Sequence, residues 1–509
     1  MARLPTVGAD SGNWGTVLNE YLETAHNADG TLKLDVKTIA DLKAIDVTTL
    51  TDKQQALVAG YAVPEDGGGG VFYYDAAAST ADNSGTVIAP TAGSGRWIRT
   101  YSGPVNVRWF GARGDSTGSS GNGTDDTTAF LAAIETLQCV YVPAGTYRVL
   151  STLTIKTGMI GEARKTTFIF FDAVAGDGLR LSEGAYGTVG ATRYRYQELR
   201  NLTVIGNLTG NYRVAVKSEN TTNAVVDNVH VNMVRANPAV YACFGFSDCW
   251  GCSFTNLHTV GTNLSTTGVG FLLGRDFNAN QCSNWYTSNA GCYANIIDDF
   301  DLRCFPAATG HGSNFSQMTL QGGRYGIRLG GQLKDCAWSS IYSENVVTSI
   351  ALGVSGGNVI YSHTFTGGSI GGPQADHPDY ASRRAAIEMI RARHCDFYNI
   401  NFAAVYGTPS PIWAVWYEDT RQCRFMGGKV QDGAQTLASY IVRSTNTGVS
   451  NGSKLMIIGD VFLPVTHRGM SLVMPTNDSY SKHYIMSVGD DGAWDAAAWT
   501  PVATDSPPV

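Results

Sequence analysis

A short phrase of alternating side chains recurs down the middle of the chain: a small residue, a variable residue, an aromatic, then an amide or small residue and an aliphatic. Its copies begin at Cys252, Ser313, Cys336, Cys395 and Cys423, with looser copies at Cys282 and His363. The steps between copies run from about 23 to 32 residues, within the range of repeat architectures. The small residue and the aromatic stand two positions apart, so on an extended strand both point to one side, which we expect to be the interior.

A second phrase of the same period also predicts strands. It alternates with a period of two and closes on glycine, at 270–274, 326–330 and 349–353. Each copy therefore holds at least two short strands with room for a third, and the absence of a 3.6-residue period excludes a helical solenoid. The pattern predicts an all-β fold, a right-handed parallel β-helix over about 135–465. We expect one corner of successive coils to hold the amides Asn256, Gln317 and Asn399, where they would satisfy turn backbone groups.

The composition agrees with this fold and limits the partners. The 509 residues include 59 glycines and only 16% charged residues, which fits many tight turns around a dry core. The net charge is −7 and no basic cluster occurs, so we expect no nucleic acid partner. Apolar runs fall short of the roughly 20 residues that span a bilayer. The start lacks a signal-peptide core, so we expect no membrane insertion and synthesis in a bacterial cytoplasm.

The cysteines predict a buried stack and no metal site or cofactor. Cys249 and Cys252 have the Cys-x-x-Cys spacing, but no second pair follows at zinc-finger distance. We expect unpaired, buried thiols at one equivalent position of successive coils, namely Cys252, Cys282, Cys336, Cys395 and Cys423. His363 holds the same position, which predicts a satisfied core histidine.

A helix is expected before the coils. Residues 122–134 read as a helix capped by Asp125 or Asp126, and a strand with a glycine turn follows at 140–147. A single amphipathic helix before a β-helix is expected to cover the open end of its core, where bare strand edges invite aggregation.

These N-terminal residues resemble a known family. The run Trp109-Phe110-Gly111-Ala112-Arg113-Gly114-Asp115, then Asp125-Asp126-Thr127 and Val142-Pro143-Ala144-Gly145-Thr146-Tyr147, is similar to the opening of pectate-lyase-like β-helix proteins, especially bacteriophage tailspikes. The segment 60–101, with Asp66-Gly67-Gly68-Gly69-Gly70 and Gly95-Arg96-Trp97-Ile98-Arg99, resembles the small domain that often precedes the β-helix. Residues 5–31 resemble attachment segments of phage or prophage tail proteins.

The resemblance implies four regions. These are an attachment segment over 1–35, a small connecting domain over 36–103, the β-helix over 104–470 with its capping helix near 124–135, and a C-terminal tail over 471–509.

It also implies a homotrimeric receptor-binding spike of the virion. Such a spike attaches to a phage tail or baseplate protein through its N-terminus, and binds and usually cleaves a bacterial surface polysaccharide. Family members are hydrolases or lyases without a shared catalytic signature, so the site must be argued from local residues. A non-catalytic tail fibre or adhesin is the alternative. A secreted plant-pectin lyase fits worse, because it leaves the attachment-like segment unexplained.

One candidate site lies on the strand after Trp338. The alternation predicts that Tyr342 and Glu344 both project outward. The equivalent outward positions are Thr319 and Gln321 on the preceding coil and Asn401 and Ala403 two coils later. A carboxylate beside an aromatic ring suits a sugar, which makes Glu344 a catalytic candidate and Tyr342 and Gln321 substrate-binding candidates. The alternative is a solvated surface glutamate.

A second acidic cluster is Asp298, Asp299 and Asp301. Neighbouring carboxylates raise each other's pKa, so Asp299 or Asp301 is a candidate second catalytic group; a turn or a calcium site is the alternative. Carboxylates two coils apart would lie about 10 Å from each other and suit inversion better than retention. Hydrolysis is favoured over elimination, for which Arg328 is the best outward cation.

An insertion supplies the last candidates. About ten extra residues separate the strand at Ile350 from its counterpart near Ile387. Long loops on rigid scaffolds often carry function, so Asp376, His377 and Tyr380 are substrate-binding candidates at a groove edge or a subunit contact. A simple surface loop is the alternative.

Overall fold

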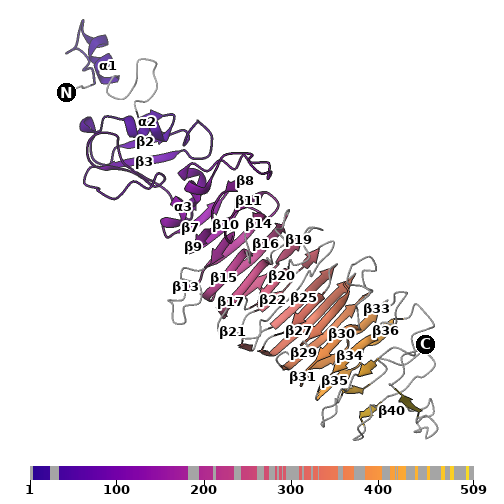
Figure 1. Cartoon of the computed structure of the whole chain (residues 1–509). Coiled ribbons are helices and arrows are strands. Elements are labelled where there is room, and N and C mark those ends of the chain that lie inside the picture. The colour runs from indigo at the N-terminus through magenta and orange to yellow at the C-terminus, as the bar shows by residue number, and fades with distance from the viewer. Residues whose placement is uncertain are drawn as a thin grey trace. The chain divides into compact units, whose positions relative to one another are not determined.

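The structure is a computed structural model of the full chain. It describes residues 4–22, 34–181, 194–209, 214–233, 242–260, 269–273, 281–283, 286–288, 291–293, 309–311, 314–321, 325–330, 332–344, 346–353, 359–371, 385–403, 413–418, 420, 422–431, 442–444, 455–458, 472–475, 482–486 and 500–503. The chain forms two compact units (Figure 1). The first is Met1–Thr117 with Asn122–Arg148 and Met159–Glu162, and the second is Gly118–Gly121 with Val149–Gly158 and Ala163–Val509.

The first unit contains the described helices and a small sheet. Its elements are α1 (Trp14–Leu22), β1 (Asp35–Val36), α2 (Ile39–Ala44), the 3-10 helix η1 (Val47–Thr49), β2 (Gln55–Val58), β3 (Gly70–Asp75), β4 (Val87–Ile88), β5 (Arg96–Arg99), β6 (Val105–Asn106), the 3-10 helix η2 (Val107–Phe110), α3 (Thr127–Glu135), β7 (Cys139–Val142), and most of β8 (Gly145–Val149) and β10 (Gly158–Gly161). None of the described helices is both long and apolar enough to cross a membrane.

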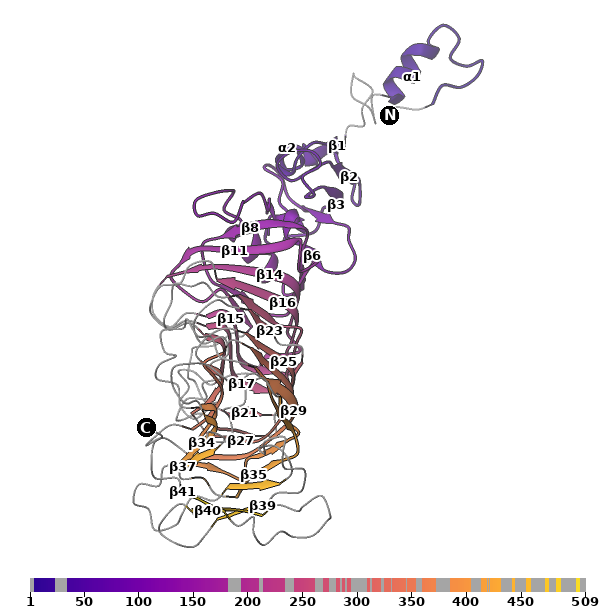
Figure 2. The ribbon, with the colours of Figure 1, turned by 90° about the vertical axis from the view of Figure 1, so that its right-hand side faces the viewer.

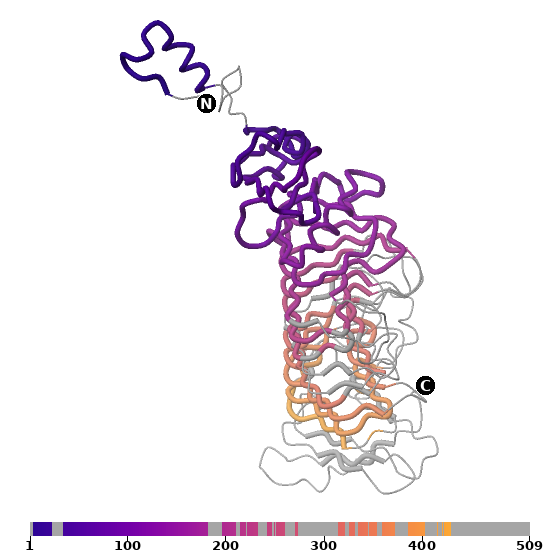
Figure 3. The backbone as a smooth tube through the Cα atoms, turned by 90° about the vertical axis from the view of Figure 1, so that its left-hand side faces the viewer, coloured from indigo at the N-terminus to yellow at the C-terminus, as the bar shows by residue number. Residues whose placement is uncertain are grey.

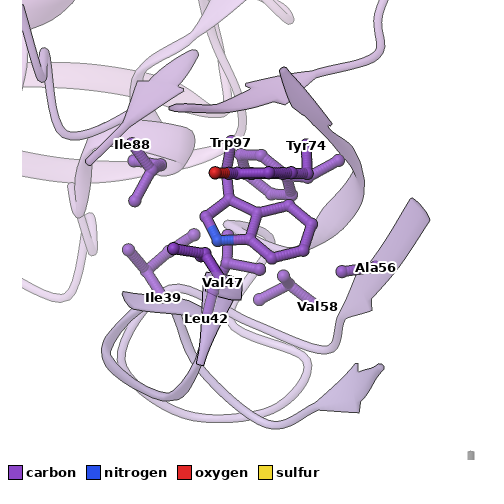
Figure 4. Close-up of a cluster of buried hydrophobic side chains, with 9 residues drawn as sticks. Ile39, Leu42, Val47, Ala56, Val58, Tyr74, Ile88 and Trp97 are labelled. Carbon is purple, nitrogen blue, oxygen red and sulfur yellow. The ribbon is translucent and has the colours of Figure 1, made fainter. Parts of the chain in front are cut away.

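The small sheet has the order β1-β2-β3-β5-β4 and a core built by alternation. Phe72 and Tyr74 on β3 point inward, and Trp97 on β5 lies against Tyr74 with ring centroids 5.5 Å apart. Figure 4 shows Trp97 surrounded by aliphatic side chains from α2, η1 and the sheet. Trp97 is fully buried, so this ring anchors the small domain.

A buried arginine joins the glycine run to the end of the sheet. The Arg99 guanidinium donates to the carbonyl oxygens of Gly68, Gly69 and Gly85 at 2.7, 2.6 and 2.9 Å. Burial lowers the pKa of Arg99 to about 10, so it remains a cation at neutral pH. A Cβ on Gly69 would lie 2.4 Å from the carbonyl oxygen of Val58, which is why glycine is needed at this close approach. These contacts explain why the glycine run and the Arg99 strand occur together.

The helix begins later than the predicted residue 122. Asp126 does occupy the N-cap position, as one of the two predicted candidates, but not through a capping hydrogen bond. α3 begins at Thr127, and Asp126 occupies the N-cap position, but its carboxylate makes no capping bond. It instead accepts from the backbone N–H groups of Arg113 and Gly114 at 2.7 and 3.2 Å. Asp125 accepts from the N–H of Thr127 at 3.0 Å. The segment before Thr127 is therefore used to hold the Arg113–Gly114 loop and does not continue the helix.

The second unit is built almost entirely of short strands. They are β9 (Leu153–Ile155), β11 (Thr167–Val174), β12 (Leu179–Leu181), β13 (Tyr194–Arg195), β14 (Glu198–Leu208), β15 (Val214–Thr222), β16 (Val225–Met233), β17 (Ala242–Trp250), β18 (Ser253–Thr255), β19 (His258–Val260), β20 (Val269–Leu273), β21 (Gln281–Ser283), β22 (Tyr286–Ser288), β23 (Gly291–Tyr293), β24 (Thr309–His311), β25 (Asn314–Gln321), β26 (Tyr325–Leu329), β27 (Gln332–Glu344), β28 (Thr348–Leu352), β29 (Ile360–Ile370), β30 (Ala385–Ile390), β31 (Ala392–Arg393), β32 (Asp396–Tyr398), β33 (Asn401–Ala403), β34 (Trp413–Glu418), β35 (Cys423–Met426), β36 (Lys429–Gln431), β37 (Val442–Ser444), β38 (Leu455–Ile458), β39 (Leu472–Pro475), β40 (Lys482–Met486) and β41 (Thr500–Ala503).

Strands of successive copies pair in parallel, which confirms the predicted parallel β-helix. One series runs β14-β16-β18-β22-β25-β27-β29-β32-β35-β38, and another, on a separate sheet, runs β26-β28-β30-β34-β37. Figures 2 and 3 show these coils stacked one on the next. After β38 the pairing becomes antiparallel, from β38 through β39 and β40 to β41.

The aromatic residues of the repeated phrase form a continuous stack inside the coils. Trp338 is fully buried, and its ring stacks on Phe315 with a centroid distance of 3.9 Å and on Phe365 with 5.5 Å. The stack continues through Phe397 to Phe425 at 4.7 and 4.3 Å, with neighbouring planes within 12°. The predicted inward position of the aromatic is therefore confirmed from copy to copy.

The thiol stack is confirmed with one correction. Cys252, Cys336, Cys395 and Cys423 are buried, and none of these four forms a disulfide. His363 is also buried, and its Nδ1 accepts from Nε1 of Trp338 at 3.1 Å, as expected of a satisfied core histidine. Cys282 does not belong to the stack, because β18 pairs with β22 and sets Phe254 opposite Thr287. That copy lacks the inward aromatic, so the looser match at Cys282 was aligned wrongly.

Two columns of left-handed residues flank the short strand that carries the repeated phrase. The first column is Tyr196, Asn223, Gly251, Asp335, Ser362, His394 and Gln422, and the second is Asn201, Asn228, Asn256, Gln317, Ser340, Gly367, Asn399 and Gly427. Asparagine and glycine adopt this backbone most easily, which explains the amides seen in the sequence. Two amides bond to the preceding coil: Asn228 Nδ2 donates to Asn201 Oδ1 at 2.9 Å, and Asn256 Nδ2 to Asp227 Oδ1 at 2.8 Å. Both bonds run to a side chain, whereas turn backbone groups were the expected partners.

Candidate functional site

Tyr342 and Glu344 form a hydrogen-bonded pair on the outer surface of β27. Ile341, which precedes the pair, and Ser343, which lies between its members, are buried, so the alternation turns Tyr342 and Glu344 outward. The Tyr342 hydroxyl donates to Oε2 of Glu344 at 3.0 Å, and 45% of Tyr342 is exposed. This bond, with a smaller contribution from burial, raises the pKa of Tyr342, so its hydroxyl stays protonated at neutral pH. The pair combines an exposed ring with a carboxylate held at a defined position.

The neighbouring coils carry small or neutral residues at these outward positions. Register places Thr319 opposite Tyr342 and Gln321 opposite Glu344 on the preceding coil. On the following coil the position beside Glu344 is Gly371, whose N–H donates to the carbonyl oxygen of Ser343 at 2.6 Å. A Cβ at Gly371 would lie 2.7 Å from that oxygen, so any other residue would have to shift. Gly371 itself therefore places no side chain beside Glu344.

Of the other predicted site residues, Gln321 is placed beside Glu344 by register, whereas Arg328 is on another sheet. Arg328 lies on β26, in the separate sheet, and its guanidinium is 4.7 Å from the ring centroid of Tyr325. Gln321 is placed by backbone register alone. The remaining candidates lie outside the described residues: Asp298, Asp299, Asp301, Asp376, His377 and Tyr380.

A buried charge cluster on β12 and β15 was missed by the sequence analysis. Oε2 of Glu219 lies 3.2 Å from Nζ of Lys217 and 3.3 Å from a guanidinium nitrogen of Arg180. Lys217 Nζ also lies 3.6 Å from Oδ2 of Asp177. Only 2% of the Glu219 side chain is exposed. The cluster pairs two carboxylates with two cations, so its formal charges balance. Its members are separated by up to about forty residues, and none belongs to a repeated phrase.

Two histidines stack at one outward position of successive coils. His230 on β16 is in register with His258 on β19. Burial, then the neighbouring His258 and Arg164, lowers the pKa of His230 to about 4, and burial also lowers that of His258. Both imidazoles are therefore neutral at pH 7. Their spacing by one copy was the available sequence signal.

Within the described ranges, no group of three histidine, cysteine, aspartate or glutamate side chains could hold a metal ion.

Two domain families match adjoining parts of the chain. Residues 35–102 match the phage tail protein small four-stranded beta-sheet domain. Residues 104–288 match the family described as rhamnogalacturonase A/epimerase, pectate lyase-like. These matches cover the small sheet with its buried Arg99, and then the first coils.

Similar proteins include phage proteins. A curated relative, "Depolymerase 1, capsule K3-specific" of Klebsiella phage KP32, is 52% identical over 56 residues, which are 10% of this chain and 6% of the relative. Among solved structures, the enzymatically active domain of tailspike protein 2 from bacteriophage CBA120 has a TM-score of 0.50 at 12% identity, over 94% of this chain and 80% of that chain. The tailspike of Acinetobacter baumannii phage AM24 has a TM-score of 0.49 at 15% identity, over 80% of this chain and 67% of that chain.

The parallel coils and the second matched domain define a pectate-lyase-like β-helix protein. The phage tail protein domain before the coils points to a phage tail protein within that class. The chain thus joins a phage tail domain to a pectate-lyase-like β-helix, which supports the predicted resemblance to phage tailspikes.

Proposed function

We propose that this protein is the receptor-binding spike of a phage tail, and that it binds and depolymerises a bacterial surface polysaccharide. The observation that carries the proposal is the Tyr342–Glu344 pair, an exposed ring 3.0 Å from a carboxylate on the outer face of a tailspike β-helix. The printed name of the phage relative, a capsule-specific depolymerase, supports the same substrate class. Its match spans only 6% of that relative, so the activity of this chain is inferred from its own residues.

Glu344 acts as the base or nucleophile of the proposed site. The Tyr342 hydroxyl donates a hydrogen bond to Glu344 and holds its carboxylate in position. The Tyr342 ring offers its exposed face to a pyranose. The gap left by Gly371 gives the sugar oxygens access to Glu344.

A second carboxylate must supply the proton to the leaving group in hydrolysis. We assign this role to Asp299 or Asp301, whose shared negative charge would keep one of them protonated. Groups two coils apart would lie about 10 Å from each other, which leaves room for the water of an inverting reaction. Gln321, Asp376, His377 and Tyr380 are proposed to bind the glycan at the groove edge. Elimination is less favoured, because its best outward cation, Arg328, lies on the other sheet.

The assembly follows the family. We propose a homotrimer in the virion, attached to a phage tail or baseplate protein through residues 1–35.

The proposal is tested by incubating purified protein with capsule or lipopolysaccharide of the host. New reducing ends without ultraviolet absorbance indicate hydrolysis, whereas unsaturated-uronate absorbance indicates elimination. Glu344→Gln keeps the shape and should lower turnover at least about a hundredfold. Glu198→Gln is the matched control, since Glu198 is an outward glutamate on β14 whose side chain is 43% exposed.

The outcomes separate the two functions considered. Equal turnover by the wild type and Glu344→Gln would remove Glu344 from the mechanism and direct attention to Asp376 and His377. Binding without cleavage of any host glycan would establish the non-catalytic adhesin instead.

A further inference from the structure

One outward position of the coils is unusually rich in basic and aromatic residues. It stands two residues before the buried cysteine or histidine of the repeated phrase. Lys334, Tyr361 and Arg393 occupy it before Cys336, His363 and Cys395, and in the sequence Arg421 stands two residues before Cys423. Successive members of this position are about 30 residues apart, so a search for adjacent charges does not detect them.

The structure brings Lys334, Tyr361 and Arg393 into one column. Backbone register sets Lys334 opposite Tyr361, and Tyr361 opposite Arg393. Lys334 Nζ lies 5.4 Å from the centroid of the Tyr361 ring, and 38% of Tyr361 is exposed. An Arg393 guanidinium nitrogen donates to the carbonyl oxygen of Ala392 at 3.0 Å, which restrains its direction. We call Lys334, Tyr361 and Arg393 the basic column.

The charge around the basic column is positive, although the chain carries −7 overall. β29, which holds Tyr361, contains no acidic residue. Asp335 is an exposed acid next to Lys334. Asp396 is paired with Arg424, its neighbour on the following coil, through two hydrogen bonds, so these two largely cancel. In the part of the surface that the structure describes, Lys334, Arg393 and the Tyr361 ring therefore lie near one exposed carboxylate, that of Asp335.

The basic column is separate from the Tyr342–Glu344 pair along the coil. Lys334 precedes the left-handed residue Asp335, whereas Tyr342 follows the left-handed residue Ser340. The two features thus lie on different strand segments of β27.

We propose that the basic column is a binding site for an anionic polysaccharide, with carboxylate or sulfate groups on the cations and a sugar ring on Tyr361. The inference rests on the proposed function and adds the charge class of the glycan. Coils repeat about every 4.8 Å, so Lys334 and Arg393, two coils apart, match charges on nearby sugars of an extended chain. Cations beside an aromatic ring can bind a ligand that carries both a sugar ring and an anionic group.

Affinity electrophoresis of the full-length protein tests the site with defined probes. Dextran sulfate and polygalacturonate supply sulfate and carboxylate groups, and uncharged dextran has the same backbone as dextran sulfate. We expect at least one anionic probe to retard the protein and dextran to have no effect. The double variant Lys334→Ala, Arg393→Ala should weaken the apparent Kd about tenfold, and Tyr361→Ala about two- to fivefold. Added salt should remove the retardation, because exposed charges are screened.

Three control variants exclude a loss of binding that has a cause other than the basic column. Lys165→Ala removes an exposed cation elsewhere in the second unit and should bind as the wild type. The double exchange Lys334→Arg, Arg393→Lys keeps both charges and should bind within about twofold of the wild type. Glu198→Gln removes a half-exposed carboxylate on β14, outside the column, and should also bind the anionic probe normally.

The results decide this inference independently of catalysis. No retardation by either anionic probe, equal retardation by dextran, or unchanged binding by the double alanine variant would overturn it. Anion binding that depends on the column would stand even if no host glycan were cleaved. Cleavage without that dependence would support the proposed function alone.

Discussion

Replacement of Trp338 tests the interior stack most directly. Trp338 is fully buried between Phe315 and Phe365, at centroid distances of 3.9 and 5.5 Å, and its Nε1 donates to Nδ1 of His363 at 3.1 Å. Trp338→Ala removes both ring contacts and the donor. Truncation of a large buried aromatic costs about 3 to 5 kcal/mol, because a cavity remains.

A second variant separates the ring from the hydrogen bond. Trp338→Phe keeps a ring in the stack but leaves Nδ1 of His363 buried without its donor, which costs about 1 to 3 kcal/mol. In a Trp338→Phe, His363→Leu double variant the unsatisfied atom is gone. Its loss should therefore be smaller than the sum of the two single losses.

Guanidinium unfolding followed by circular dichroism measures these differences. Midpoints are converted to free energies only where the slopes agree. The reasoning fails if Trp338→Ala costs less than about 1 kcal/mol, because a stacked, sealed interior cannot absorb that void. It also fails if Trp338→Phe is as damaging as Trp338→Ala.

Three other predictions follow from the site and the fold. Asp299→Asn with Asp301→Asn should lower turnover as strongly as Glu344→Gln, at least about a hundredfold, and wild-type turnover in this variant would remove the pair from catalysis. Light scattering should give about three times the 54.3 kDa chain mass, and a stable monomer at micromolar concentration would contradict the trimer. The folded-state pKa of His230 is about 4, below its ordinary value of 6.5, so its stabilising contribution is complete above pH 6.5 and is lost as pH falls towards 4. The melting-temperature difference between wild type and His230→Gln should shrink across that window, and a constant difference would refute a titrating His230.

The repeated phrase predicted the interior because side-chain alternation and packing depend on the same local geometry. Cys252, Cys336 and Trp338 were assigned correctly from spacing alone. The error at Cys282 arose where the copy lacks an aromatic, so the match rested on one cysteine and Trp285. Backbone pairing, which a single sequence does not reveal, sets Thr287 opposite the buried Phe254.

The site was less predictable because it depends on contacts between copies. Tyr342 and Glu344 were found because they lie on one strand. Glu219 and Lys217 were missed because their ion pairs involve Arg180 and Asp177, which lie about forty residues earlier and are brought beside them by the stacking of coils. For the same reason the helix start was misjudged, since the carboxylate of Asp126 serves the Arg113–Gly114 loop.

The two left-handed columns have a consequence for how such a spike can change. Their members stand five positions apart in each copy where both are described: 196 and 201, 223 and 228, 251 and 256, 335 and 340, 362 and 367, 394 and 399, and 422 and 427. The segment between the two columns has the same length in each of these copies. Insertions and deletions are therefore expected in the rest of the copy. Recombination with junctions inside this constant-length segment would preserve the register of the stacked coils and replace whole surface loops. The fold thereby separates a segment of constant length from the connections between segments, whose length can vary.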